Sequence, residues 1–158
     1  MIIGTEGAGS FTAPANSAYL VSQLTAQNMR PKIREVGLFT QAATIGTIIQ
    51  LGRPAAAPSG STPAGAITTV TEDPSDYAAA AFFIYAGTGW GTTNPTAPNP
   101  ASRQWALQAG PGTSQIFFWP PDGELLLAIT LGATGNFVVW NGGSSAGPAL
   151  DAYIVAGA

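Results

Sequence analysis

Short runs of alternating hydrophobic and polar residues recur along the chain, and they predict β-strands. The clearest run is Thr44–Arg53 (TIGTIIQLGR), which is rich in β-branched residues. Successive side chains of a strand point to opposite faces, so a period of two residues indicates a strand. One face of this strand is expected to carry Ile45, Thr47, Ile49 and Leu51.

A second strand is predicted over Lys32–Phe39 (KIREVGLF), where a regular alternation would place Arg34 on the same face as Val36. The same reasoning predicts a series of short strands along the rest of the chain. They are Phe82–Tyr85, Gln104–Leu107, Ile116–Trp119, Leu125–Leu131, Phe137–Trp140 and Tyr153–Val155.

In two segments, the sequence pattern does not decide between a helix and a strand. Residues Ala15–Asn28 (ANSAYLVSQLTAQN) fit a helical stripe with Asn16 or Ser17 as N-cap, but they also alternate like a strand, which we narrowly favour. Asp76–Ala81 (DYAAAA) has good helix propensity, which indicates one helical turn. A strand that continues into the Phe82–Tyr85 run competes closely with it.

Glycine- and proline-rich turns separate these runs, and the whole pattern predicts a single all-β domain, an antiparallel β-sandwich or barrel. Two loops, Ala55–Pro63 and Thr92–Pro100 (TTNPTAPNP), are long and rich in proline. Proline lacks the backbone donor that a central strand needs. We therefore expect these loops to cross between the two sheets, or to carry contacts. Residues 1–15 could form an extended N-terminal arm.

The composition argues against several classes of protein. The 158 residues include no histidine and no cysteine, and the net charge is −3. Catalytic triads of the Ser-His-Asp and Cys-His kinds are therefore impossible. A nucleic-acid-binding protein would need a far larger basic surface, and no hydrophobic run reaches the ~18–20 residues of a membrane span. We expect no enzyme, no cofactor, no nucleic acid and no membrane partner.

One acidic cluster, Glu72, Asp73 and Asp76, offers oxygen ligands for calcium. It lacks the Asp-x-Asp-x-Asp-Gly spacing of a calcium loop, and a solvated turn that caps a helix explains it as well. We assign no metal to it.

The tryptophans are the remaining candidates for contact. Trp90 lies in a glycine-rich stretch (GTGWGTT) and is the one best placed for an exposed contact. Trp119 and Trp140 end hydrophobic strands, so both are expected to close the core at one end of the sandwich.

The segment that begins at Pro31, PKIREVGLFTQAATIGTIIQLGR, resembles a recurring segment of small virion-associated proteins of tailed bacteriophages. Those proteins pair a "(K/R)-hydrophobic-R-E-(V/I/L)-G-(V/L)-F" strand with a following hydrophobic strand. The C-terminal part is similar to the same group, because a WPPDGELLLA strand leads through a glycine turn to NFVVWNGGSSAGPALDAYIV. Many members end in an aromatic and acidic tail, whereas this chain ends in IVAGA.

The resemblance implies an antiparallel, jelly-roll-like β-sandwich on or near the phage head, and no catalytic residue. We therefore expect a structural virion protein, a capsid decoration protein that binds the major capsid protein and stabilises the head. The alternative is a head or tail appendage that recognises a host-surface glycan or protein. The expected contact residues are Arg30, Lys32, Arg34, Trp90, Asn94, Pro95 and Pro98.

The chain is expected to assemble as a homotrimer. Only 8% of its residues are charged, and uncharged surface is tolerated best where neighbouring subunits bury it. The three-fold symmetry comes from the resemblance, because decoration proteins often occupy three-fold positions of the capsid lattice. Light scattering at micromolar concentration checks the mass. A stable monomer would leave assembly to the capsid alone, and a dimer would contradict the three-fold argument.

Overall fold

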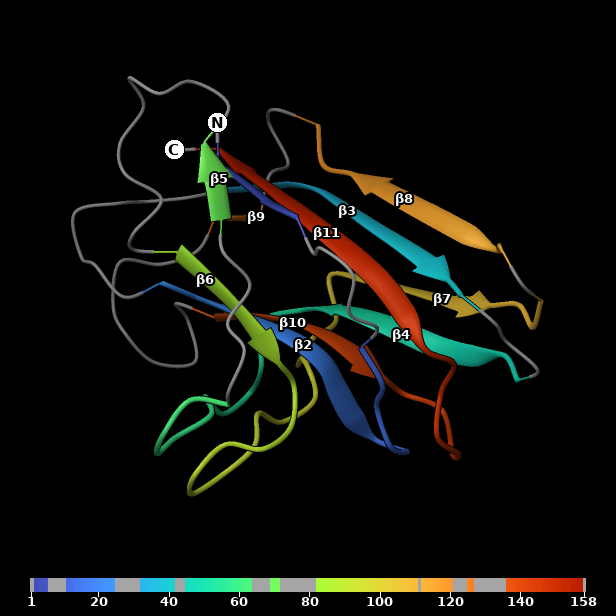
Figure 1. The fold of residues 1–158 in the computed structure, drawn as a ribbon, viewed down its shortest axis with the longest axis horizontal. Coiled ribbons are helices and arrows are strands. Elements are labelled where there is room, and N and C mark those ends of the chain that lie inside the picture. The colour runs from blue at the N-terminus through green and yellow to red at the C-terminus, as the bar shows by residue number, and fades with distance from the viewer. Residues whose placement is uncertain are drawn as a thin grey trace.

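Eleven strands and no helix make up the part of the chain that this computed structural model describes, namely residues 2–5, 11–24, 32–41, 45–63, 69–71, 82–110, 112–120, 125–126 and 136–157 (Figure 1). In chain order the strands are β1 (Ile2–Thr5), β2 (Ser17–Leu24), β3 (Lys32–Thr40), β4 (Thr47–Gly52), β5 (Thr69–Thr71), β6 (Phe82–Ala86), β7 (Arg103–Leu107), β8 (Ser114–Phe118), β9 (Leu125–Leu126), β10 (Asn136–Asn141) and β11 (Leu150–Gly157).

The strands form two antiparallel sheets, which Figure 1 shows as two layers. Sheet A has the order β5-β1-β11-β3-β8, and β9 pairs with the start of β3. Sheet B has the order β6-β2-β10-β4-β7. The all-β class predicted from the sequence is therefore confirmed for the described residues.

One hydrophobic core fills the space between the two sheets. Val36 and Leu38 of β3 face it from sheet A, while Ile49 and Leu51 of β4 face it from sheet B. Each such side chain stabilises the fold by roughly 1.5–3 kcal/mol when it is fully buried. The largest fully buried side chains are Tyr19, Phe137, Leu20, Ile33, Leu38, Ile49, Leu51, Ile84 and Leu150.

A second hydrophobic cluster lies on the outer face of sheet B. Val21 of β2 pairs in register with Val138 of β10 on one side and with Tyr85 of β6 on the other. These three side chains point away from the core, and Trp90 packs with them in one cluster. Part of the outer face of sheet B is therefore covered by the chain that follows β6.

Two β-bulges change which side chains face the core. The register between β3 and β11 skips Arg34, so Ile33 and Val36 are both buried in the core although they are three residues apart. Arg34 itself is exposed. Its predicted place on the face of Val36 is wrong, because an extra residue in one strand reverses the alternation. In β2 the extra residue is Tyr19, which lets Tyr19 and Leu20 both enter the core.

Most of the predicted strands are present, with shifted ends. The strand that we favoured within residues 15–28 is β2. β8 begins at Ser114, two residues before the predicted strand. β4 begins at Thr47. Ile45, predicted on the same face as Thr47, Ile49 and Leu51, precedes the strand and is half exposed. The predicted helical turn at 76–81 and most of the predicted strand over 125–131 lie outside the described residues.

The pattern did not predict two of the strands. Ile2–Thr5 forms β1, which pairs with β11 on one side and with β5 on the other. Both β1 and β5 are too short to show a clear period. Residues 2–5, which could have formed an extended arm, therefore lie inside sheet A.

The buried side chain of Asn141, at the end of β10, holds three segments together. Its nitrogen donates hydrogen bonds to the carbonyl oxygens of Ala13 (3.2 Å), Pro14 (2.8 Å) and Ser145 (3.0 Å). Its oxygen accepts hydrogen bonds from the hydroxyl of Thr47 and from the amide of Gly143. The segment before β2, the start of β4 and the loop after β10 are thereby fixed to one another.

Asn141→Ala should lower the free energy of unfolding by about 2–4 kcal/mol, because it leaves several buried partners without a hydrogen bond. Urea unfolding with an unchanged slope checks this value. The matched control is Asn94→Ala, which removes one exposed asparagine with a single long bond and should cost less than about 1 kcal/mol. Equal losses for the two variants would contradict the role of Asn141.

Candidate docking surface

The basic residues predicted as contacts belong to the first part of β3. Lys32 and Arg34 are both exposed there. Lys32 lies opposite Leu126 of β9 in the register. Arg30 lies outside the described residues. The structure therefore places two of the three predicted basic contacts on the surface of sheet A.

The two proline-rich loops lie against each other. The amide of Ala55 donates to the carbonyl of Ala97 (3.1 Å), and the amide of Ser59 donates to the carbonyl of Thr93 (3.0 Å). In chain order the first loop follows β4 of sheet B and precedes β5 of sheet A, as a crossover should. The second loop joins β6 to β7, the two edges of sheet B, so it is not a crossover between the sheets.

Trp90 is not the exposed contact residue predicted from its glycine-rich neighbourhood. Its side chain is only 8% exposed and packs edge-on against Tyr85, with ring centroids 5.4 Å apart. The reason is that Val21 and Val138 offer it a hydrophobic outer face of sheet B. Burial there removes more apolar area from water than exposure in a turn would allow.

The other predicted residues of this loop hold it in place. Asn94 is exposed, and its side-chain oxygen accepts a hydrogen bond from the amide of Trp90 at 3.3 Å. Pro95 and Pro98 are buried. Pro98 lies so close to Gly52 that a Cβ added there would stand 2.9 Å from it. Of the four predicted loop contacts, only Asn94 is therefore exposed.

The exposed large hydrophobic residues lie outside these loops, on or next to strands β4 and β8. Among the described residues, four large hydrophobic side chains are exposed: Ile45 (50%), Ile48 (39%), Ile116 (40%) and Phe118 (65%). Ile116 and Phe118 belong to β8, the edge of sheet A. Ile48 belongs to β4, next to the edge strand β7, and Ile45 precedes it. Figure 1 shows these strands on one side of the molecule.

On the outer face of sheet A, the strands β3 and β11 continue the surface that begins at β8. Ile116 lies opposite Gly37 of β3, and the ring of Tyr153 from β11 covers this glycine. Any side chain at position 37 would overlap the ring, which explains the glycine. Phe118 lies opposite Glu35, whose carboxylate accepts a hydrogen bond from the Tyr153 hydroxyl. The single acidic group of this row is therefore already engaged.

Aromatic side chains close the core between the two edge strands. Trp105 of β7 packs on Phe117 of β8, with ring centroids 3.8 Å apart. The guanidinium of Arg103 lies 5.9 Å from the centre of the Trp119 ring. Trp119 is buried in the core, as its position predicted, whereas Trp140 is buried in the cluster on the outer face of sheet B and not in the core.

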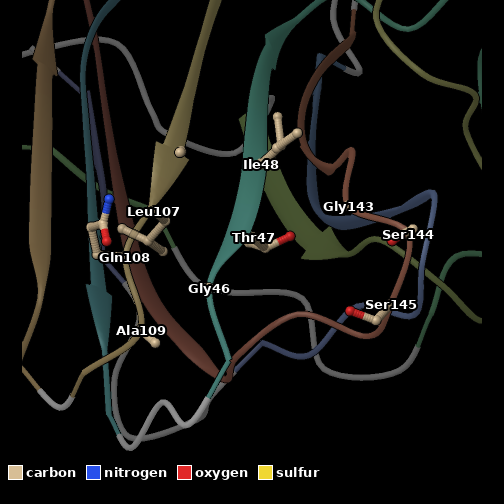
Figure 2. A pocket seen from close by; sticks show the side chains of 10 residues that line it. Gly46, Thr47, Ile48, Leu107, Gln108, Ala109, Gly143, Ser144 and Ser145 are labelled. Atoms are coloured by element: carbon tan, nitrogen blue, oxygen red, sulfur yellow. The ribbon is translucent and has the colours of Figure 1, made fainter.

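A shallow depression of ≈ 490 Å³ lies beside β4 (Figure 2). The start of β4, the end of β7 and the loop after β10 enclose it. None of the described residues that line it is charged. Its polar groups are the side chains of Thr47, Gln108, Ser144 and Ser145, and its apolar wall includes Ile48. Such a lining suits a neutral polar group, and it contains no acid or base.

The described residues contain no cluster of three histidine, cysteine, aspartate or glutamate side chains that could hold a metal ion. The acidic cluster Glu72, Asp73 and Asp76 lies outside them. In the same part of the chain, no helix has the length and hydrophobicity to cross a membrane. Comparison with protein-family models, with curated proteins and with solved structures finds no match.

Tyr153, on the outer face of sheet A, has a raised pKa. Burial is the main cause, and the hydrogen bond to Glu35 and the negative charge of Glu35 add to it, so that the pKa of the Tyr153 hydroxyl rises to about 12. The ring of Phe39 stacks beside it, with centroids 6.0 Å apart. An unfolded tyrosine has a pKa of about 10.

Stability should therefore fall between about pH 10 and pH 12. In this window the folded chain still holds the Tyr153 proton, which the unfolded chain has lost, so a rise in pH favours unfolding. Glu35→Gln removes the negative charge and should lower the pKa of Tyr153. Ultraviolet difference absorbance of tyrosinate measures the titration, and Tyr153→Phe identifies its contribution. An unchanged titration in Glu35→Gln would contradict the pairing.

Proposed function

We propose that the two sheets form a jelly-roll β-sandwich. The strands pair as a long folded ribbon would, β1 with β11, β2 with β10, β3 with β8 and β4 with β7. Winding this ribbon brings β11 also beside β3, and β10 beside β4. The result is two four-stranded sheets, β1-β11-β3-β8 and β2-β10-β4-β7, as expected for a jelly roll. β5, β6 and β9 are additions to these eight strands.

We further propose that the protein is a structural virion protein, a capsid decoration protein that docks on the phage head and binds the major capsid protein. Jelly rolls are common in viral capsid proteins, which supports this role. The resemblance to small virion-associated phage proteins also fits the fold. Its two segments supply β3 and β4, and β10 and β11, which are central strands of the two sheets.

The observation that carries the proposal is the exposure of two large hydrophobic side chains on one face of an edge strand. Ile116 and Phe118 lie two residues apart on the outer face of β8, the edge of sheet A. Soluble proteins rarely leave such side chains together in water unless a partner covers them. A decoration protein covers one side of itself on the head and leaves the other side in solvent. The predicted trimer remains part of this proposal.

Docking should persist in high salt. The chain has only 13 formally charged side chains, 5 basic and 8 acidic, and the proposed docking side is hydrophobic. Exposed ion pairs are screened at ~1 M salt, where the Debye length is about 3 Å. Heads of the encoding phage that lack this chain are mixed with purified protein, washed in salt and measured on a stained gel. Hundreds of copies per head are expected.

Two charge-matched variants locate the docking side. Phe118→Asp places a charge on the exposed hydrophobic side and should reduce binding about ten-fold or more, since burying an unpaired charge is costly. Thr62→Asp places the same charge on an exposed position of the first proline-rich loop and should bind as the unchanged protein does. No binding by the unchanged protein would overturn the proposed function, and release by salt alone would contradict a hydrophobic docking side.

The alternative, an appendage that binds a host-surface glycan or protein, is favoured by one observation. The uncharged depression presents the hydroxyls of Ser144 and Ser145 and the amide of Gln108, groups that can bind sugar hydroxyls. An appendage occurs in few copies per particle. The same stained gel of purified virions would therefore separate the two functions.

A further inference from the structure

The hydrogen bonds between β3 and β8 determine which backbone groups of β8 face outward. The amide of Thr40 donates to the carbonyl of Thr113 (2.9 Å), and the amide of Trp119 donates to the carbonyl of Arg34 (2.8 Å). Along an antiparallel strand, residues alternate between bonding to one neighbour and facing the other side. The odd-numbered residues from 113 to 119 therefore bond to β3.

The even-numbered residues, Ser114, Ile116 and Phe118, consequently turn their amides and carbonyls away from β3. No described strand pairs with that side of β8. The Ile116 carbonyl has a local contact that agrees with this direction, because the side-chain amide of Gln115 lies 3.4 Å from it. β8 thus turns three N–H groups and three C=O groups away from β3, and one of these carbonyls, that of Ile116, already accepts a long hydrogen bond from Gln115.

Within the described part of the chain, this edge lacks the features that usually protect an edge strand. Natural proteins block such edges with charges, proline, bulges or a covering segment. β8 reads SQIFF, with no charge and no proline, and its register with β3 contains no shift. The residues with outward backbone groups also carry the exposed side chains of Ile116 and Phe118. The outward backbone groups and the exposed hydrophobic side chains together favour the addition of one further strand.

We infer that β8 is completed by an added strand from the head subunit on which the protein docks, an extended and uncharged segment with hydrophobic side chains at alternate positions. This inference rests on the proposed function. In strand addition, main-chain hydrogen bonds supply affinity, and alternate side chains supply selectivity. The hydrophobic side chains of the added segment would pack beside Ile116 and Phe118. A basic residue there would find the carboxylate of Glu35 already engaged by Tyr153.

A second copy of the chain fits this edge less well. Two β8 strands could pair with each other over five residues, which is a length of about 17 Å. Stable interfaces between folded proteins bury about 1,200–2,000 Å², and a contact this short supplies only a small part of that area. A segment of an already docked subunit does not need to hold the complex alone, since the rest of that subunit contributes further contacts.

Ser114→Pro and Ile116→Pro test the added strand, because each removes one outward amide and leaves the bonds to β3 in place. Both should bind the heads described above about ten-fold more weakly or worse, since a partner carbonyl loses its donor. Ser114 is the first residue of β8, where proline is tolerated, so this variant keeps the test valid if Ile116→Pro misfolds. Ile116→Thr is the matched control: it shortens the side chain but retains the amide, and it should lose less.

A second measurement separates strand addition from docking by side chains alone. Amide hydrogen exchange in the 114–118 segment should slow several-fold when heads are bound, and exchange in the Thr62 loop should not change. Normal binding by the folded proline variants, or unchanged exchange at 114–118, would overturn the added strand and leave the docking function standing. A lower mass of the free proline variants in light scattering would show that a second copy occupies the edge, which also overturns the inference.

Discussion

Both sheets depend on the pairing of the last two strands with the first four. β11 lies between β1 and β3, and β10 lies between β2 and β4. Without either strand, its sheet would separate into two parts, and core residues such as Phe137 and Ile154 would lose their places. The partner strands come from the first third of the chain, so the core forms only when distant segments meet. Asn141 strengthens this arrangement at the end of β10 by bonding to the segment before β2 and to the start of β4.

The two sheets differ in how their outer faces are covered, and the connections between strands explain the difference. The chain must cross sheet B to pass from β6 at one edge to β7 at the other. This crossing brings Trp90 over Val21 and Val138. The connection from β7 to β8 is short and stays at one side, so it covers neither Ile116 nor Phe118. A hydrophobic surface therefore remains at β8.

The scarcity of charge gives this surface its character. Along β8 the groups that can bind a partner are backbone amides, backbone carbonyls and uncharged side chains. Glu35, the acidic residue opposite Phe118, is engaged by Tyr153. Recognition by such a surface depends on shape and on strand register, and salt should affect it little. An edge without charges also needs a partner or a cover to avoid open-ended pairing.

The sequence by itself determined the all-β class and most strands, because alternation along a run such as TIIQLG directly reflects which side chains face a core. It did not reveal the bulges at Tyr19 and Arg34, since one extra residue is visible only against the partner strand. It also misplaced Trp90, whose burial depends on where the chain crosses sheet B. The exposed hydrophobic surface at Ile116 and Phe118 could not be predicted from the sequence either. The alternation of these residues indicates that they share one face of a strand. Only the strand order decides which strand is an edge and which face no other segment covers.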